Sequence, residues 1–398
     1  MAFWSLGDNL PSVCVEIDFT NTPFSSTATW TDVTSYVRRF SFSRGREGEL
    51  EAASPGQAAF TLSNNDRRFD PTFASSPYYP NVLPMRKVRI RCQWAGVTYN
   101  LFRGYIDDFP LSWPEDGKDA IVEVTATDAF KILNLYDLGG KSYASHLDSV
   151  RMGTVLADAG FGTADYSIQT GNVTIVASGT IAQDTMALGH LLDVNQSEPG
   201  VFFVDGGGTI QWQNKTYRYT LASQGTISNA AGGVTFKEPR SLYGDKRIFN
   251  RAVVTPSGGT AEVSTAGTAS TGQYGTRTLA LSGLQAAQND ALNQAQYLTY
   301  KYGTPFLEIP EVQVVPQGQF GAALWPTVLA SEISKPYTFQ YVLPGTLGTI
   351  TQGQYLEKIQ MDVSADRGWQ TRWRLSSGSA GVFWVLDSSA LDVSTVPG

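Results

Sequence analysis

The chain contains few cysteines, few histidines and few charged residues, and each shortage excludes a class of protein. It has 398 residues, of which two are cysteine, two are histidine and 16% are charged. Two cysteines cannot form a disulfide framework in a chain this long. Cys14 and Cys92 lie in strand-like runs, so we expect buried, reduced thiols. A net charge of −7 argues against a protein that binds nucleic acid through a basic patch.

Long apolar runs are absent as well. No stretch approaches the roughly 18 apolar residues that a transmembrane helix needs, so we expect no membrane anchor. Residues 1–8 have neither a basic segment nor an apolar core. We therefore expect no secretory signal, and synthesis and assembly in a host cytoplasm.

Residues capable of catalysis or metal binding do not form a recognisable pattern. The stretch Gly139–Ser142 looks like the end of a phosphate-binding loop, but the glycine required five residues before Gly140 is replaced by Leu135. His146 and His190 lack the spacing of metal ligands, and the Gly-x-Ser-x-Gly turn of serine hydrolases is missing. We predict no catalytic residue, no cofactor and no metal.

Paired carboxylates remain, and two of them are all that a glycan-cleaving enzyme needs. Asp107 and Asp108 are adjacent, as are Glu115 and Asp116. Neighbouring residues of a strand point to opposite faces, so Asp107 and Asp108 are not expected to share a site. Glu115 and Asp116 precede a Gly-Lys pair and are typical of a solvated hairpin turn.

Glycine and aromatic residues, in contrast, are abundant. Glycine occurs 39 times, aromatic residues make up 12% of the chain and hydrophobic residues 42%. With a charged fraction below the usual level of about 25%, this composition predicts β-dominated domains whose surfaces are covered in an assembly. At about 150 residues per domain, the length predicts two or three domains.

Residues 1–135 are predicted to form a first β domain. Apolar and polar residues alternate with the period of a half-buried strand, as at Val122, Val124 and Ala126. Residues 44–49 read as a charged, glycine-punctuated loop, and Asp128 is expected to cap a short helix. Strands this frequent predict a sandwich or barrel.

The rest of the chain is predicted to contain an α+β domain at 136–245, a second β domain at 246–375 and a C-terminal docking tail at 376–398. In the α+β domain we expect helices at 149–159 and 185–195, the second capped by Asp184, and a hairpin at 201–213. In the second β domain we expect a mobile Gly/Ser/Thr-rich loop at 257–275 and one long helix at 286–302.

One connection is too long and too apolar to be ordinary. Residues 64–84 link two predicted strands, whereas median connections run about 4–6 residues. Its aromatic side chains argue against disorder. We expect an ordered loop packed within its own domain or on a neighbouring chain. The interface candidates, which include two residues of the C-terminal tail, are Phe69, Phe73, Tyr78, Tyr79, Phe383 and Trp384.

Four segments resemble the minor tail proteins of long-tailed phages that infect actinobacteria, within the baseplate-hub or tail-tip hub family. They are Phe42-Ser43-Arg44-Gly45-Arg46, the run from Pro55 to Pro71, Ser76-Pro77-Tyr78-Tyr79-Pro80-Asn81-Val82 and Leu101-Phe102-Arg103-Gly104-Tyr105-Ile106-Asp107. The resemblance covers most of the chain and is strongest between residues 40 and 110. Residues 247–254, the helix at 286–302 and residues 368–375 are similar to the second tube-like domain of such hubs.

The resemblance implies a mainly β fold in which two tail-tube-like β-barrel domains flank a small α+β domain. It implies a homotrimer that forms a ring with pseudo-sixfold symmetry at the virion tail tip. Such a ring joins the distal tail or tail tube protein to the tip or fibre proteins and surrounds the end of the tape measure protein. DNA passes through it at ejection without specific binding. A long fibre or lysin extension is not seen after residue 398, so we expect a connector.

Two other functions stay open on the sequence alone. A receptor- or carbohydrate-binding tail protein would need an exposed aromatic platform, for which Trp94, Trp113 and Trp212 are candidates. A tail-associated cell-wall hydrolase would need the paired carboxylates. For the hub, the acidic balance leads us to expect that residues facing the channel are net negative, because cationic groups would hold DNA.

Overall fold

The computed structural model describes residues 9–115, 118–316, 324–364 and 368–378, together with the short strands β25 (Val382–Trp384) and β26 (Thr395–Pro397). Strands account for 40% of the fold and helices for 18%, so the prediction of a mainly β fold is confirmed. Within the described residues we find no closed barrel; most strands join one large antiparallel sheet.

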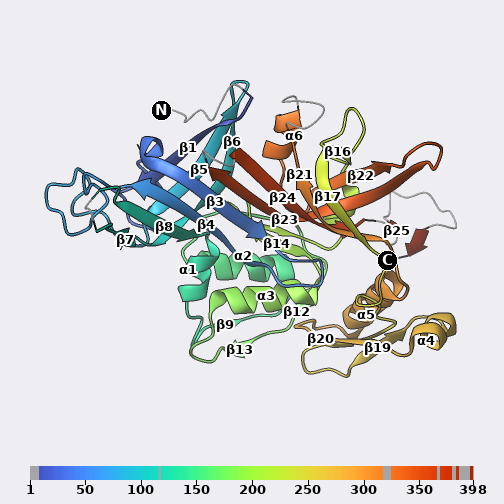
Figure 1. The fold of residues 1–398 in the computed structure, drawn as a ribbon. Helices are drawn as coiled ribbons and strands as arrows, with labels where there is room; N and C mark the ends of the chain where they lie inside the picture. The colour runs from blue at the N-terminus through green and yellow to red at the C-terminus, as the bar shows by residue number, and fades with distance from the viewer. Residues whose placement is uncertain are drawn as a thin grey trace.

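Fourteen strands form this sheet, and they come from both halves of the chain (Figure 1). The strands from the N-terminal half are β1 (Ser12–Asp18), β2 (Thr31–Asp32), β3 (Val37–Gly45), β4 (Ser54–Ser63), β5 (Lys87–Trp94), β6 (Val97–Asp108), β7 (Leu111–Ser112) and β8 (Ile121–Thr127). The others are β16 (Thr226–Ser228), β17 (Phe236–Leu242), β21 (Glu308–Val314), β22 (Pro336–Val342), β23 (Thr349–Ser364) and β24 (Gly368–Ser377). The two sets meet where β3 pairs antiparallel with β23, with Phe42 opposite Met361.

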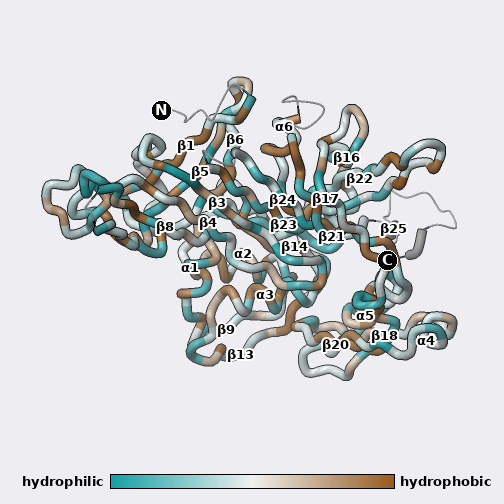
Figure 2. Tube along the Cα trace, in the orientation of Figure 1, coloured by the Kyte–Doolittle hydropathy of each residue, from teal (hydrophilic) through white to brown (hydrophobic). Residues whose placement is uncertain are grey.

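Burial along the strands follows the alternation of the sequence. In β8, Val122, Val124 and Ala126 are buried and the residues between them face outward. Hydrophobic and hydrophilic residues alternate along the strands of the sheet in Figure 2. One hydrophobic cluster draws on both halves of the chain, since it contains Phe60 from β4 and Trp373 from β24. The two halves therefore share a core.

A smaller α+β unit lies below the sheet in Figure 1 and has its own core. Its elements are α1 (Phe130–Leu135), β9 (Ser142–Tyr143), β10 (His146–Leu147), α2 (Asp148–Asp158), β11 (Tyr166–Ile168), β12 (Thr174–Ile175), β13 (Gly179–Thr180), α3 (Ala187–Ser197), β14 (Val201–Val204) and β15 (Ile210–Gln213). The two predicted helices and the hairpin are present, with Phe202 opposite Trp212.

Two predicted helix caps have different outcomes. The prediction for Asp128 is off by one residue: Ala129 occupies the N-cap position of α1 without a side-chain cap bond, while the Asp128 carboxylate before it accepts a hydrogen bond from the Phe130 N–H at 2.9 Å. The prediction for Asp184 is wrong. Helix α3 begins at Ala187, and Met186 before it forms a β-bridge with Asp137, which keeps the preceding backbone extended. Asp184 instead occupies a turn with φ of 64°.

A third unit surrounds the long helix, at the lower right of Figure 1. It consists of β18 (Arg251–Thr255), β19 (Glu262–Thr265), α4 (Thr268–Tyr274), β20 (Thr278–Ser282) and α5 (Gln288–Tyr302). Helix α5 confirms the predicted helix. The predicted mobile loop at 257–275 is wrong, because it contains β19, paired with β18, and α4, where the buried Ser270 hydroxyl donates to the Gly303 carbonyl at 2.5 Å.

Two short 3₁₀ turns, Thr34–Tyr36 and Tyr217–Thr220, and helix α6 (Trp325–Leu329) complete the described elements. Cys14 and Cys92 are buried and unbridged on the neighbouring strands β1 and β5, as predicted. Burial raises the pKa of both thiols. The division of the chain into domains at 135, 245 and 375 stays a prediction.

A buried pair of carboxyl groups ties the α+β unit together. Asp148 at the start of α2 and Glu198 just after α3 are both fully buried and hydrogen-bonded to each other. Glu198 also accepts hydrogen bonds from the backbone and side-chain amides of Asn172, at 3.0 and 2.7 Å. Burial and the adjacent Glu198 raise the pKa of Asp148 to about 9, so the pair retains one proton at neutral pH.

This shared proton makes the stability of the fold depend on pH. Because the folded-state pKa of Asp148 lies above its unfolded-state value, folding retains a proton that the unfolded chain releases, and stability falls as pH rises from 5 to 8. In Asp148→Asn the amide donates to Glu198 without titrating. We expect the free energy of unfolding of the native protein to fall relative to that of the variant by up to about 1.4 kcal/mol per pH unit. Parallel urea-unfolding profiles from pH 5 to 8 would contradict the shared proton.

Candidate functional site

The long loop at 64–84 is ordered, and its aromatic residues divide into two groups. Phe69 is fully buried and Tyr78 stacks between Phe69 and Phe19, with ring centroids 5.6 and 4.2 Å away. Both rings therefore pack within the chain, and the interface role expected for Phe69 and Tyr78 stays a prediction. Tyr79, in contrast, is 48% exposed.

Phe73 lies at the surface of the loop beneath a cation. The Arg67 guanidinium sits 4.6 Å from the Phe73 ring and 5.8 Å from the ring of Trp113, which is 48% exposed. Arg67, Phe73 and Trp113 therefore form an outward-facing cluster, which we call the loop patch. The other two interface candidates, Phe383 and Trp384, belong to β25, but their side chains lie outside the described residues.

A second candidate surface is the outer face of the large sheet where the two halves of the chain meet. Most side chains on this face of β4, β3 and β23 are small or uncharged, and Asp362, opposite Ser41, adds an exposed carboxylate. We call this surface the polar sheet face and define it by Ser41, Ser43, Gln57, Ala59, Thr125 and Gln360. Shallow hollows of about 380 and 330 Å³ lie over it. Nothing on it resembles the deep apolar cleft of a small-molecule site.

Two cations beside the polar sheet face have carboxylate partners, whereas Arg372, exposed opposite Gln360 on β24, has no ion pair with a described residue. Arg39 lies 3.1 Å from Glu123. Arg374 lies 2.8 Å from Glu47, which also pairs with Lys358. These pairs reduce the free positive charge available to a polyanion that contacts this face.

Asp107 and Asp108, the paired carboxylates of β6, do not have the orientations that we predicted. A β-bulge between Ile106 and Asp108 interrupts the pairing with β8. As a result Asp107 accepts a hydrogen bond from Thr127 at 3.0 Å and Asp108 from Thr125 at 2.8 Å, although both threonines lie on one face of β8. The expected opposite orientation is wrong, because a bulge breaks the two-residue alternation. Asp107 is also paired with Lys131.

The remaining residues singled out in the sequence lie in ordinary packing environments. His190 stacks on Tyr143 at 5.9 Å, and burial lowers its pKa to about 4. Trp212 is buried and donates to Asn195 at 3.1 Å, so it cannot belong to an exposed platform. Trp94 packs on Trp325 at 6.2 Å. In the part of the chain that the structure describes, no group of three metal-ligating side chains converges and no helix is long and apolar enough to cross a membrane.

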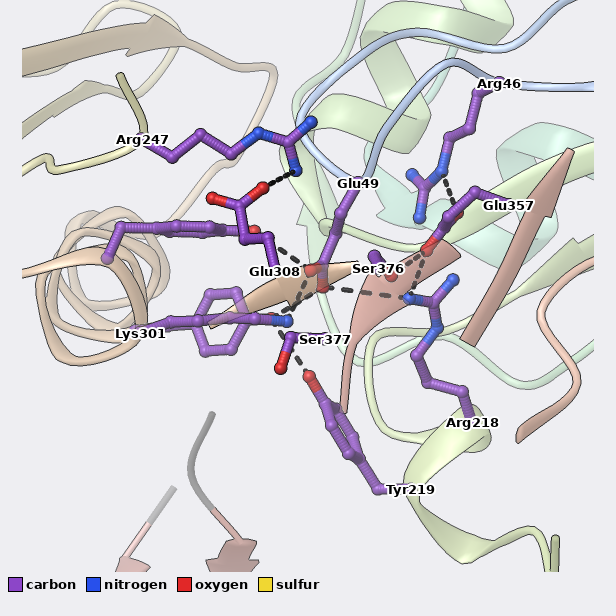
Figure 3. A network of polar contacts seen from close by, with 12 residues as sticks. Arg46, Glu49, Arg218, Tyr219, Arg247, Lys301, Glu308, Glu357, Ser376 and Ser377 are labelled. Atoms are coloured by element: carbon purple, nitrogen blue, oxygen red, sulfur yellow. Dashed lines mark hydrogen bonds and ion pairs between the residues drawn. The ribbon is translucent and has the colours of Figure 1, made fainter. Parts of the chain in front are cut away.

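A buried network of charges, which the sequence patterns do not single out, joins distant parts of the chain (Figure 3). Glu357 on β23 is fully buried. Its carboxylate lies 2.6 Å from Arg46 and 2.8 Å from Arg218, and accepts a hydrogen bond from Ser376 at 2.5 Å. Burial alone would raise the pKa of Glu357, but the two guanidinium groups outweigh it and hold that pKa below its ordinary value.

Glu49, in the loop between β3 and β4, extends the network to helix α5. It pairs with Lys301, whose side chain is 1% exposed. It accepts hydrogen bonds from the hydroxyls of Tyr302 at 2.9 Å and Tyr297 at 3.2 Å. Arg218 lies 3.7 Å from Glu49 and so links it to the first carboxylate. Figure 3 shows Glu49 between Lys301 and Arg218.

The contacts between the third unit and its surroundings are largely polar. Besides the Glu49 contacts, the side chains of Gln285 and Gln294 donate to the carbonyls of Ser197 and Gln196, each at 2.9 Å. The apolar residues of this unit form a separate cluster. Glu49 therefore holds α5 against the large sheet mainly through charge and hydrogen bonding.

Replacing Glu49 with glutamine should loosen this contact. Glu49→Gln leaves Lys301 buried and unpaired, for which we expect a loss of about 3–5 kcal/mol in the free energy of unfolding and faster amide hydrogen exchange along α5. The control is Glu123→Gln, which breaks the exposed Arg39–Glu123 pair and should cost less than about 1 kcal/mol. Equal losses in the two variants, or unchanged exchange in α5, would show that Glu49 does not hold the helix.

Neither a protein-family model nor a curated protein sequence matches the chain, but solved structures resemble its fold. The tail protein from Neisseria meningitidis MC58 matches with a TM-score of 0.62 over 93% of this chain and 98% of that one, at 10% identity. The 43 kDa tail protein of prophage MuSo2 from Shewanella oneidensis matches with a TM-score of 0.54 over 92% and 97%, at 12% identity.

A chain in the lidless PdpA–VgrG complex matches with a TM-score of 0.51 and 8% identity, covering 93% of this chain and 66% of that one. At these identities the likeness concerns the fold alone. Over nearly its whole length, this chain has the fold of phage tail proteins.

Proposed function

We propose that this chain is a structural protein of a phage tail tip, a hub that connects the tail tube to the tip, and that it is not an enzyme. The observation that carries the proposal is the sheet continuous across both halves of the chain, with β3 paired to β23 over seven residue pairs from Lys358–Gly45 to Ser364–Arg39. Such a sheet gives a wide, rigid wall. The fold shared with tail proteins over 93% of the chain supports a role in the tail.

The proposed assembly is a homotrimeric ring with pseudo-sixfold symmetry. In it, residues 1–135 and 246–375 act as two tube-like barrel domains, completed by contacts between subunits, and flank the α+β domain at 136–245. Each half of the chain supplies strands to the shared sheet, as two related ring positions require. The hub of actinobacterial long-tailed phages, to which the sequence bears a resemblance, is the specific form of this proposal.

The polar sheet face is the proposed lining of the DNA channel. The side chains that define this face are small and uncharged. They therefore give DNA neither a row of cations to bind its phosphates nor aromatic rings on which its bases could stack. Two cations at its border are paired with Glu123 and Glu47. We keep the proposal that the channel is net negative, with DNA passing transiently at ejection.

The proposed partners are a distal tail or tail tube protein on one side, tip or fibre proteins on the other, and the end of the tape measure protein within the ring. The exposed Tyr79 and the half-buried Phe73 of the long loop are the proposed contacts with a neighbouring subunit or partner. Phe383 and Trp384 of the C-terminal tail are proposed to dock on a partner.

Placing lysines on the polar sheet face tests the channel. Ser41 and Ala59 are directly opposite one another on β3 and β4. In phage carrying Ser41→Lys with Ala59→Lys, we expect tails to assemble normally but DNA ejection to slow at least several-fold, because lysines bind phosphates. The matched control, Ser41→Glu with Ala59→Glu, changes size similarly with the opposite charge and should eject at the native rate. If both pairs eject alike, this face does not line the DNA path.

Substituting Tyr79 tests the long loop as an assembly contact. Tyr79→Ser removes an exposed ring without touching the buried Phe69–Tyr78 stack, so the fold should persist. We expect at least a tenfold loss of trimer or tail-tip assembly, measured by light scattering and by electron microscopy of tails. Tyr300→Ser is the control, because Tyr300 is equally exposed, at 48%, but lies on α5. Normal assembly with Tyr79→Ser would show that the exposed part of the loop makes no assembly contact.

A further inference from the structure

A pocket of about 290 Å³ opens where the first half of the sheet meets the α+β unit. Its walls come from the loop after β1, from β5 and β6, from α1, from the segment after α2 and from the turn between β14 and β15. Given that a water occupies about 30 Å³, the pocket could hold an amino-acid side chain with part of its backbone. Neither the channel nor the partner contacts proposed above use it.

The polar groups of this pocket carry hydrogen-bonding capacity that the chain does not use. Arg103 makes no hydrogen bond or ion pair with any described residue; its guanidinium only faces Trp30, at 5.7 Å from the ring. The Tyr105 hydroxyl likewise has no hydrogen-bond partner within the described ranges. A guanidinium has five N–H donors in a planar fork, so the unused capacity is large.

Lys87 adds a second cation, and it is held in place. It is 4% exposed, and its ammonium donates to the carbonyls of Ser25 and Thr27, the latter at 3.5 Å. Those carbonyls carry only partial charge, and the full negative charges near Lys87 are those of Asp18, directly opposite it on β1, and Asp165. Burial, with the charge of Arg103 second, lowers the pKa of Lys87.

Asp165 supplies the one carboxylate among the described lining residues. It accepts a hydrogen bond from the Gly162 N–H at 2.9 Å, which fixes it at the wall. The lining cations are Lys87 and Arg103, and because Asp18 beside Lys87 offsets part of its charge, Arg103 is the cation without a carboxylate partner among the described residues. The walls between these groups are apolar, at Ile132 and at Phe24, which is 70% exposed.

We propose that this pocket is a binding site for a carboxylate of a polypeptide, with Arg103 gripping the two oxygens and the Tyr105 hydroxyl donating to one of them. A carboxylate fits the planar fork of a guanidinium, and such charged hydrogen bonds are among the strongest in proteins. A carboxylate carries a single negative charge and so meets less repulsion from Asp165 and Asp18 than a phosphate dianion would. The apolar walls accommodate the aliphatic stem of a glutamate, and Asp165 can accept an N–H of the same ligand.

The test measures binding of acetyl-glutamyl-amide to the full chain by titration calorimetry at low salt, with the neutral acetyl-glutaminyl-amide as the comparison ligand. We expect the glutamyl compound to bind at least tenfold more tightly. Arg103→Gln should lower its affinity at least tenfold, and Tyr105→Phe, which keeps the wall and removes only the hydroxyl, about threefold. Arg39→Gln, a substitution of an arginine outside the pocket, should leave the affinity unchanged. Circular dichroism would confirm that each variant is folded.

Equal affinity for the two ligands, or native affinity in Arg103→Gln and Tyr105→Phe, would overturn the proposal. Sedimentation of the chain with saturating acetyl-glutamyl-amide then separates two sources of the natural carboxylate. Dissociation of an oligomer assigns the carboxylate to a second copy of this chain. An unchanged oligomer, in a chain that binds the ligand as expected, assigns it to a different polypeptide.

Discussion

The pairing of β3 with β23 is the constraint on which the rest of the structure depends. Because β3 is hydrogen-bonded to β4 on its other side, this contact turns two groups of strands into one sheet with one core behind it. Phe42 and Met361 face each other across the join and are both buried. A one-residue slip here would exchange the core face for the polar face on one half of the sheet, so the packing of both halves fixes the register.

The ion pairs of this lightly charged chain have a different role from the strand pairing. Many of its ions face water in pairs at the surface, but several are buried where units meet. Glu49 lies between the sheet and α5, Glu357 lies within the sheet against Arg46 and Arg218, and Asp148 with Glu198 lies between elements of the α+β unit. Buried ions are costly unless every one has a partner. Since they are tolerated only in one arrangement, we interpret these contacts as fixing how the units sit against one another, with hydrophobic burial supplying most of the stability.

The sequence predicts the structural features that depend on neighbouring residues. It does not predict the features that depend on contacts between distant residues. Alternation and apolar stripes locate the strands and the helices α2, α3 and α5 to within a few residues. The join between β3 and β23 has no local signal, because its partners are far apart in the chain and a barrel would show the same alternation. The bulge at Ile106 shifts Asp107 without a glycine to mark it. The only hint of the ion network was the charged loop at 44–49, whose partners Arg218 and Lys301 lie in unrelated segments.

The same contrast between local and distant determinants distinguishes the polar sheet face from the pocket at Arg103. A face whose strands show Ser41, Ala59 and Thr125 to solvent can be read from the alternation, because outward residues of a half-buried strand are free to be small. Arg103 cannot be read in this way. Its alternating position on β6 predicts only that it points away from the core, and what makes it notable is that α1 and the segment after α2 line a pocket beside it in which no described residue pairs with its guanidinium. Arg103 is half-buried and its N–H donors are unused within the described residues, so a partner that supplies a carboxylate would gain charged hydrogen bonds on binding.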